Sequence, residues 1–298
     1  LMQAQAGIVE PIYKQLKDPT TGGQPSTVSM SITPDGKKMF VLSHTRNKYY
    51  IYDLTTPFDL STMDVSNRSE VDFVGDDPPS ASQIKDIEFN NDGTKVFVFG
   101  RNGTLHIHNL TTPYDVASIS SSTAVPDDGL DYNTAYGTVS RIHGVTFNND
   151  GTKMYLSDGT ITSTDITQVN LSTPFDPSSG TSTYNLNTES ITARYTMDLA
   201  FDDDGTRLYL SESKTSVAIN YMYVWKLSNP FELSSATYVD KWQILGNGNN
   251  LSPYAWTFGN NGMKLYIGTE DASTDGDNII YEYDLSCPYG IVLCESET

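Results

Sequence analysis

One ten-residue stretch, 89–98, recurs five times along the chain and constrains its fold more than any other feature. Its sequence is Phe-Asn-Asn-Asp-Gly-Thr-Lys-Val-Phe-Val, and every copy places an Asp-Gly or Asn-Gly pair between two apolar runs. Such a pair between runs rich in β-branched and aromatic residues is the strongest short-range signal for a β-hairpin. The period of the copies predicts a repeat architecture. The five glycines, Gly36, Gly93, Gly151, Gly205 and Gly262, lie 57, 58, 54 and 57 residues apart.

A second signature has its proline 20 to 26 residues after each of these glycines, and its first copy is Leu-Thr-Thr-Pro-Phe-Asp at 54–59. Proline fixes φ and lacks a donor for a strand ladder, so each copy is expected to end a strand in a turn. Each repeat then holds four antiparallel strands, which we call A, B, C and D. Five repeats of this kind predict an all-β fold, a five-bladed β-propeller of four-stranded antiparallel blades.

The N-terminal segment is expected to close the ring within a single domain, 1–298. Outer strands are predicted 18 to 24 residues before the glycine in several repeats, and the same offset before Gly36 gives 12–18, which has no repeat in front of it. The fifth repeat runs out of chain before an outer strand of its own. We therefore expect 12–18 to join the last blade, which removes an open sheet edge. The expected blades span 28–75, 85–122, 142–187, 196–244 and 254–289 with 12–18, and a tail follows at 290–298.

Large side chains at two aligned positions are expected to form the core between the blades. They stand four residues before and four residues after each glycine, and we assign them to stability and not to chemistry. The first set is Ile32, Phe89, Phe147, Phe201 and Phe258, and the second is Phe40, Phe97, Tyr155, Tyr209 and Tyr266.

The formal net charge of −19 makes nucleic acid and anionic membranes unfavourable partners, because a protein binds either of them through a basic surface. The sequence has no apolar run of about 18 residues, so no membrane span is predicted. The opening residues, 1–7, lack the basic and apolar regions of an export signal, so any targeting peptide is expected to have been removed or to lie outside this sequence.

Loops that differ from blade to blade are the predicted recognition surface. The A–B and C–D turns, which are uniform here, share one face of a propeller, and the variable B–C and D–A loops share the other. We call these the uniform-turn face and the variable-loop face. The longest variable loop, 123–141, carries Tyr132, Tyr136 and Arg141, which suit stacking on sugars or anchoring a protein partner. A solvated surface loop is the alternative. Tyr254, at the channel mouth, completes the predicted ligand-binding set.

The start of each A strand is expected to line the mouth of the central channel. There Asp86, Asp198 and His143, with Glu88 deeper in, form the cluster that is most like a catalytic or metal-binding arrangement. Propeller glycosidases use carboxylates at such places, one as the acid and another as the base or nucleophile. The alternative is a solvated, water-filled channel.

Other chemical signals are weaker. His106 and His108 align with aromatic residues of other repeats and are predicted to pack in the core. Asp275 and Asp277 resemble part of a calcium loop, but they lack the bidentate glutamate of an EF-hand, so neither a metal nor a cofactor is predicted. Cys287, seven residues before Cys294, is compatible with a small disulfide or with two free thiols. Glycosylation sequons, relevant to a secreted eukaryotic protein, occur at Asn67, Asn102, Asn109, Asn170 and Asn250.

The paired motifs at 147–155 and 171–176, Phe-Asn-Asn-Asp-Gly-Thr-Lys-Met-Tyr and Leu-Ser-Thr-Pro-Phe-Asp, resemble propeller repeats of predicted tail-fibre and surface proteins of aquatic phages and bacteria. The copy at 33–41 is similar to blades of microbial surface-layer propellers. The resemblance covers 28–289 and implies a scaffold without a shared catalytic set. The two cysteines and the short last blade depart from the repeat.

The leading hypothesis is a non-enzymatic recognition or structural module on a virion appendage or an extracellular filament. Its expected partner is a surface glycan or a protein, bound through the variable-loop face, and self-assembly into a larger particle is compatible with it. A carbohydrate-active enzyme with carboxylates at the channel mouth is the first alternative. A purely architectural subunit of an assembly is the second.

Overall fold

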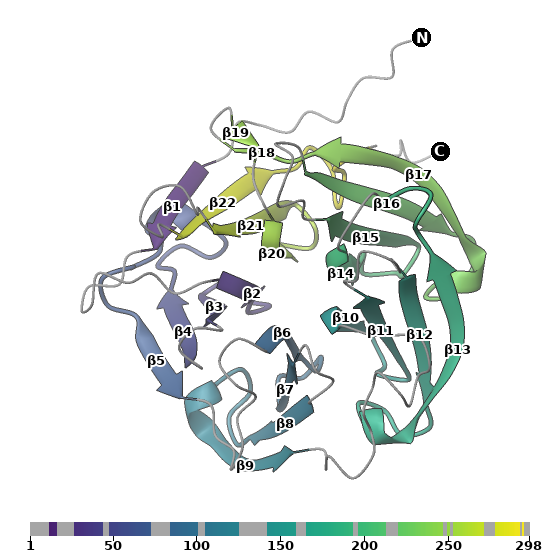
Figure 1. Ribbon diagram of the computed structural model, residues 1–298. Coiled ribbons are helices and arrows are strands. Elements are labelled where there is room, and N and C mark those ends of the chain that lie inside the picture. The colour runs from purple at the N-terminus through teal and green to yellow at the C-terminus, as the bar shows by residue number, and fades with distance from the viewer. Residues whose placement is uncertain are drawn as a thin grey trace.

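Four sequence repeats each fold into one four-stranded antiparallel sheet, the fifth does so together with the N-terminal strand, and the five sheets stand in a ring (Figure 1). This computed structural model confirms the predicted five-bladed β-propeller. It describes residues 12–16, 27–43, 48–72, 84–100, 105–124, 142–158, 165–192, 196–212, 220–246, 249–250, 253–270, 278–292 and 294.

The strands of a blade follow the chain from the centre of the ring to its rim, in the order A to D. B and C strands are buried along most of their length, because both faces of a blade pack against other blades. The rim strands are largely exposed. The blades are β2 (Thr27–Ile32), β3 (Lys38–Ser43), β4 (Lys48–Asp53) and β5 (Ser69–Asp72); β6 (Ile84–Phe89), β7 (Lys95–Gly100), β8 (Leu105–Leu110) and β9 (Ile119–Ala124); β10 (Ile142–Phe147), β11 (Lys153–Asp158), β12 (Asp165–Leu171) and β13 (Gly180–Asn187); β14 (Thr196–Phe201), β15 (Arg207–Glu212), β16 (Tyr221–Leu227) and β17 (Ala236–Gln243); and β20 (Pro253–Gly259), β21 (Lys264–Glu270) and β22 (Asn278–Asp284).

The N-terminal strand closes the ring, as predicted. β1 (Ile12–Leu16) pairs antiparallel with β22, with Ile12 opposite Glu282 and Leu16 opposite Asn278. The sheet order of the last blade is therefore β1-β22-β21-β20, and the two ends of the chain share one sheet (Figure 1). Of the predicted strand at 12–18, the last two residues lie outside the described part of the chain.

The predicted aromatic core joins each blade to the next. Phe97 of blade 2 lies 4.9 Å from Phe147 of blade 3, measured between ring centroids, and Tyr155 lies 4.6 Å from Phe201. The residues four after each glycine are fully buried, whereas most of those four before it are half-buried. No helix among the described residues is long and apolar enough to cross a membrane.

The two repeated turns of each blade contact each other. Every motif glycine has a positive φ, and so does the aromatic residue that follows each motif proline. In blade 1 the NH of Phe58 donates to the carbonyl oxygen of Gly36 at 2.9 Å. A 3₁₀ turn follows in four blades, and its first residue is buried. These turns are η1 (Leu60–Thr62), η2 (Val116–Ser118), η3 (Pro177–Ser179) and η4 (Leu233–Ser235).

The C-terminal segment replaces this 3₁₀ turn in blade 5. Cys287 and Cys294, for which the sequence left two alternatives, form a disulfide, with their Cα atoms 5.8 Å apart. Gly290 stands where blades 1 to 3 have an aspartate, and a Cβ there would lie 2.1 Å from the Cys287 sulfur. Ile291 is 1% exposed and takes the buried position that begins each 3₁₀ turn. Between blades 4 and 5, in a segment not expected to hold strands, β18 (Leu245–Gly246) pairs with β19 (Asn249–Asn250).

Candidate functional site

Most of the predicted recognition residues fall outside the described part of the chain, and their roles stay predictions. Of the sequons that are described, Asn67 and Asn170 are exposed, whereas Asn109 is half-buried on β8. Outside the described residues lie Tyr132, Tyr136, Arg141, Asn102, Asp275 and Asp277, and only the backbone is described for Tyr254 and Asn250.

Every innermost strand begins with a β-bulge, and the predicted channel residues Asp86, His143 and Asp198 lie at it or next to it. The register against strand B shifts between Ile84 and Asp86 in blade 2, and between Ile142 and Gly144 in blade 3. The bulged residue of blade 3 is His143, whose Nδ1 lies 3.4 Å from the sulfur of Met197 in blade 4. The other three blades show the same shift. Bulges commonly re-aim the side chains beside them, and here these side chains reach neighbouring blades.

Asp86 connects three consecutive blades. Its Oδ1 accepts hydrogen bonds from the Ser29 hydroxyl of blade 1 at 2.6 Å and from the NH of Ile87 at 2.8 Å. Its Oδ2 accepts a bond from the NH of Val145 of blade 3 at 2.6 Å. The residue is 4% exposed. This burial raises the pKa of Asp86 to about 7, although the three hydrogen bonds favour the ionised form.

Asp198 has a related position in blade 4. Its Oδ1 accepts a bond from the NH of Leu199 at 2.8 Å, and the NH of Trp256 in blade 5 also bonds to it. Burial, and to a lesser extent the charge of Asp86, raise the pKa of Asp198. Gly144 of blade 3 packs closely here, since a Cβ on it would lie 2.7 Å from the Cα of Asp198. Each aspartate thus bonds to the blade that follows its own.

Glu88 also bonds to the following blade. Its Oε1 accepts a bond from the hydroxyl of Thr146 at 3.3 Å, and burial raises its pKa, with a smaller contribution from the charge of Asp86. No group of three or more His, Cys, Asp or Glu side chains within the described ranges is arranged to hold a metal ion. The channel carboxylates therefore make inter-blade contacts, whatever chemistry they also perform.

His106 and His108 pack as predicted. They are 6% and 1% exposed, and their rings stack with centroids 6.3 Å apart. Burial, and then the neighbouring His106, lower the pKa of His108 to about 4, so this ring is neutral near pH 7.

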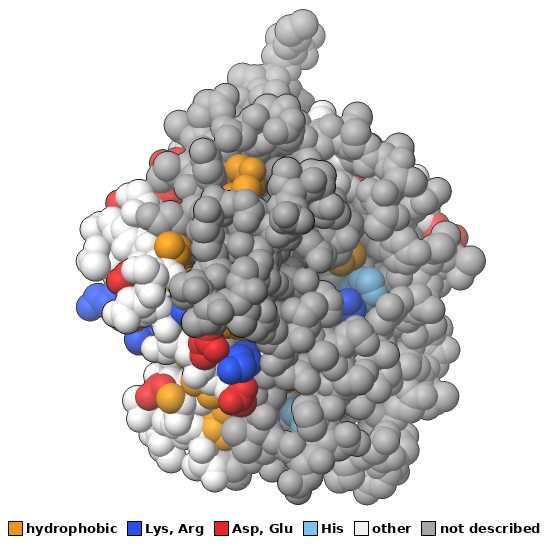
Figure 2. Space-filling view, turned by 60° about the vertical axis from the view of Figure 1, so that its left-hand side comes forward, with side chains coloured by type: hydrophobic (Ala, Val, Ile, Leu, Met, Phe, Trp, Pro, Cys, Tyr) orange, Lys and Arg blue, Asp and Glu red, His pale blue; other side chains and the backbone are white. Residues whose placement is uncertain are grey.

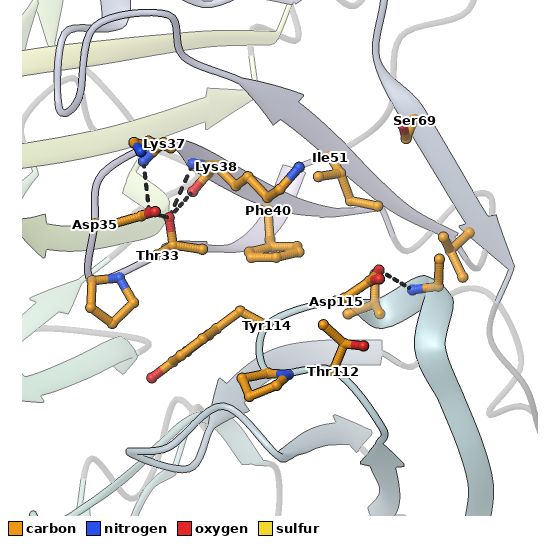
Figure 3. A pocket seen from close by; sticks show the side chains of 15 residues that line it. Thr33, Asp35, Lys37, Lys38, Phe40, Ile51, Ser69, Thr112, Tyr114 and Asp115 are labelled. Carbon is orange, nitrogen blue, oxygen red and sulfur yellow. Dashed lines mark hydrogen bonds between the residues drawn. The ribbon is translucent and has the colours of Figure 1, made fainter.

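A cavity of about 570 Å³ opens between blades 1 and 2 on the uniform-turn face, and not on the face where the recognition surface was predicted. We call it the blade 1–2 cleft. Phe40 and Ile51 line one side and Tyr114 lines the other, so that they face each other across a gap (Figure 3). Val116 also lines the cavity. Small-molecule sites are typically concave, mostly apolar and about 300–1,000 Å³ in volume. The cleft meets these criteria.

Polar side chains surround this apolar interior. Lys38 and Asp35 belong to the A–B turn side, and Thr112 and Asp115 to the C–D turn of blade 2 (Figure 3). Lys38 forms an exposed ion pair with Asp53, 2.8 Å between Nζ and Oδ1. The described surface in Figure 2 likewise shows acidic and basic side chains beside small hydrophobic patches. An apolar interior with a few polar groups at its edge can both hold and orient a ligand.

One cross-strand pair of strands B and C lies beside the cleft to the next blade, and its residues differ from blade to blade. In blade 5 the pair is Tyr266 opposite Glu282. The hydroxyl of Tyr266 donates to the carbonyl oxygen of Phe58 in blade 1 at 2.7 Å, and Glu282 Oε2 accepts from the NH of Leu60 at 2.5 Å. The blade 5–1 cleft is therefore bridged by polar contacts.

The corresponding pair of blade 3 works in the same way. Tyr155 stands opposite Gln168, and its hydroxyl donates to the carbonyl oxygen of Phe231 at 2.6 Å. Gln168 Oε1 accepts from the NH of Leu233 at 2.9 Å. In blade 1 the pair is Phe40 opposite Ile51, which has no polar atoms to make these bonds. This difference leaves the blade 1–2 cleft without the two bridges.

The cavity at the equivalent place between blades 4 and 5 is only about 20 Å³. There the hydroxyl of Tyr209 donates to the carbonyl oxygen of Tyr289 at 2.8 Å, and Val292 also lines the cavity. The sequence did hold a signal for this variation, in the residue six positions before each motif proline. That position holds Ile51, Ile107, Gln168, Val224 and Glu282.

Comparison with known proteins gives the fold alone. No protein-family model matches the chain, and no curated protein does. The resemblance to tail-fibre and surface-layer propellers therefore stays a prediction.

Many solved structures match the chain at low sequence identity. A luciferin-regenerating enzyme is 10% identical with a TM-score of 0.50, over 95% of this chain and 100% of that one. A functionally unknown protein from Desulfotomaculum acetoxidans is 13% identical with a TM-score of 0.49, over 90% and 84% of the two chains. Hydrazine synthase from Kuenenia stuttgartiensis is 12% identical with a TM-score of 0.44, over 86% of this chain, which spans only 60% of that one. At such identities the likeness carries no function.

Proposed function

We propose that the protein is a non-enzymatic recognition module that binds a ligand in the blade 1–2 cleft. The observation that carries this proposal is a cavity of about 570 Å³ with an apolar interior, at a place that polar side chains bridge after blades 3 and 5. Phe40 and Tyr114 offer aromatic surface to a ligand, and Lys38 and Thr112 offer polar groups that can orient it. A rigid propeller presents such a site without any moving part.

We further propose an extracellular setting, on a virion appendage or a surface filament, with a surface glycan or a protein as partner. The bond between Cys287 and Cys294 supports this setting, because disulfides persist in oxidising compartments. In this proposal the variable-loop face, with Tyr132, Tyr136 and Arg141, is a second recognition surface on the other face of the ring.

Binding to a panel of surface polysaccharides, and to intact cells, tests the proposal. Wild-type protein is expected to bind a member of the panel. Ile51→Glu, which places a charged side chain in the cleft, is expected to weaken that binding, and joint alanine substitution of Tyr132, Tyr136 and Arg141 is expected to weaken it as well. Ile107→Glu, at the equivalent position of blade 2, is the control. Failure to bind any panel member, or binding that neither substitution changes, contradicts the proposal.

A carbohydrate-active enzyme at the channel mouth is the second candidate, and the raised pKa of Asp86, about 7, favours it. A carboxyl group that keeps its proton near neutral pH can protonate a leaving oxygen. Turnover of a polysaccharide by the wild type, abolished in Asp86→Asn with Asp198→Asn, would support this candidate. Turnover that survives both substitutions would eliminate it.

A further inference from the structure

The blade 5–1 cleft shows which chemical groups the uniform-turn face accommodates. Glu282 is 0% exposed there, and its carboxylate takes two partners. One is the NH of Leu60, and the other is the ammonium group of Lys264, which bonds to Oε1. A main-chain donor and a lysine thus hold one buried carboxylate against the neighbouring blade, as charge-assisted hydrogen bonds allow.

The blade 1–2 cleft retains both of these donors but lacks the carboxylate. Lys38 stands two residues after Gly36, as Lys264 stands two residues after Gly262, and it lines the cleft. Val116 begins η2, as Leu60 begins η1. The residue equivalent to Glu282 is Ile51, which can accept no hydrogen bond.

Among the main-chain NH groups equivalent to that of Leu60, the one in the blade 1–2 cleft lacks a hydrogen-bond acceptor within the described residues. In the described part of the chain, the NH of Val116 has no acceptor, although it borders a cavity large enough for a ligand. Buried main-chain donors are nearly always paired in folded proteins, so an acceptor on a ligand would be favoured here. At the other four positions, Leu60 bonds to Glu282, Leu233 bonds to Gln168, Ile291 bonds to Tyr289, and Pro177 has no NH to satisfy.

We propose that the blade 1–2 cleft binds a small organic acid, that is, a carboxylate on an apolar body. The carboxylate takes the place that Glu282 has in the blade 5–1 cleft, where it accepts from the NH of Val116 and from Lys38. The apolar body fills the space between Phe40, Ile51 and Tyr114. This inference rests on the proposed function, because it names the ligand class of the same cleft.

A carboxylate fits better than a neutral amide. The amide of Gln168 lies beside Glu232, whose side chain is one methylene longer than the aspartate found at this position in blades 1 to 3. Glu232 forms the ion pair with the neighbouring lysine, Lys153. In the blade 1–2 cleft the residue equivalent to Glu232 is Asp115. Blade 1 also has an aspartate there, Asp59, which directly precedes Leu60, the residue whose NH donates to Glu282. The closer match is therefore the cleft that holds a carboxylate.

Two acidic groups of the blade 1–2 cleft would repel an anion, and both are already hydrogen-bonded. Asp115 Oδ1 accepts from the NH of Ala117 at 3.0 Å. Asp35 Oδ1 accepts from the hydroxyl of Thr33 at 2.6 Å and from the NH of Lys37 at 3.1 Å. The equivalent of Asp115 in blade 1, Asp59, coexists with the carboxylate of Glu282, so one neighbouring aspartate does not prevent binding.

The test compares 3-phenylpropionate with its neutral amide, 3-phenylpropanamide, as probes of the full chain near pH 7. Dissociation constants come from ligand-observed NMR and from calorimetry. We expect the acid to bind at least tenfold more tightly than the amide. Lys38→Gln, a change at an exposed side chain that leaves the core untouched, is expected to reduce this preference at least threefold.

Ile51→Glu is expected to abolish binding of the acid, because it supplies the missing carboxylate from the protein itself. Phe40→Tyr with Ile51→Glu reproduces the pair of blade 5 and is expected to do the same. Ile107→Glu is the matched control, since its cleft faces Pro177, which has no NH, and it is expected to leave binding unchanged. Thermal melting of each variant shows whether it folds. If a glutamate variant does not fold, the effect of Lys38→Gln on the preference for the acid tests the proposal.

The outcomes separate this inference from the proposed function. Equal affinity for acid and amide, both lost in Ile51→Glu, overturns the carboxylate assignment but leaves a ligand-binding cleft. The same conclusion follows if neither probe binds but a polysaccharide or protein partner does, and Ile51→Glu prevents the binding of that partner. Binding of the acid that Ile51→Glu and Lys38→Gln leave unchanged overturns the assignment of the site.

Discussion

The ring of Phe58 packs directly against the Cα of Gly36 and leaves no room for a side chain on that glycine. A Cβ on Gly36 would lie 2.4 Å from Cδ2 of the phenylalanine. Both residues have a positive φ, 69° for the glycine and 61° for the phenylalanine. Because the same packing recurs in every blade, the two repeated turns of the sequence are one structural unit. The other pairs are Gly93 with Tyr114, Gly151 with Phe175, Gly205 with Phe231, and Gly262 with Tyr289.

Gly93→Ala should lower the free energy of unfolding by about 2 kcal/mol or more, because it combines a positive φ with overpacking. The new Cβ would lie 2.3 Å from the ring of Tyr114. Urea unfolding measures the change. In the background of Tyr114→Ala, which removes the ring, the same substitution should cost only about 1 kcal/mol, the backbone part alone. An equal cost in both backgrounds would disprove the packing explanation.

Removing an inter-blade tyrosine hydroxyl should cost about 1 kcal/mol of unfolding free energy, because a half-buried carbonyl oxygen loses its donor. Tyr155→Phe and Tyr266→Phe test this, since their hydroxyls donate to Phe231 and Phe58. Tyr184→Phe, on the exposed strand β13, is the control and should change stability by less than about 0.5 kcal/mol. If the buried and exposed substitutions cost the same, these hydroxyls do not hold the blades together.

The contribution of Asp86 to stability should fall as the pH rises from about 4 to about 7. Asp86, with a pKa of about 7 in the folded protein and an ordinary one near 4 when unfolded, binds more protons in the folded state over this interval. Its stabilising contribution is complete below about pH 4 and is lost through about pH 7. Asp86→Asn does not titrate, so the stability of the wild type relative to this variant should decline over the same range.

Urea unfolding at several pH values measures this decline, and Asp92→Asn provides a control of opposite sign. The hydroxyl and NH of Thr94 lower the pKa of Asp92, so its contribution is present at neutral pH and is lost on acidification. A wild type that gains stability relative to Asp86→Asn between pH 4 and 7 would show that the hydrogen bonds to Asp86 outweigh its burial.

The turn chemistry of the repeats was enough to predict the fold. Gly36 and its equivalents marked the hairpins, and the missing outer strand of the fifth repeat predicted that 12–18 would close the ring, as β1 does. These features could be predicted because each depends on local backbone preference and on counting. The spacing of the cysteines, by contrast, allowed two alternatives, because the separation of two thiols depends on the path of the chain between them.

The candidate site was not predicted, because it depends on differences between repeats and not on their common pattern. Phe40 was correctly assigned to the core, yet its missing hydroxyl matters only when Tyr266 is seen to reach across to Phe58. Likewise, Ile51 becomes informative only beside the contact of Glu282 with Leu60. Such contacts join residues more than 200 positions apart, which no spacing along the chain can reveal.

The disulfide should stabilise the closing blade by about 2 kcal/mol, a typical value for a short loop. In blade 5 the outer strand is β1, so the chain beyond β22 has no strand ladder to continue into. The bond between Cys287 and Cys294 holds this segment, including the buried Ile291, against the blade. Cys287→Ala with Cys294→Ala should therefore lower the unfolding free energy by this amount, as measured in urea. Dithiothreitol should produce the same loss in the wild type and none in the double variant, whereas an equal response of both proteins would mean that the bond does not contribute to stability.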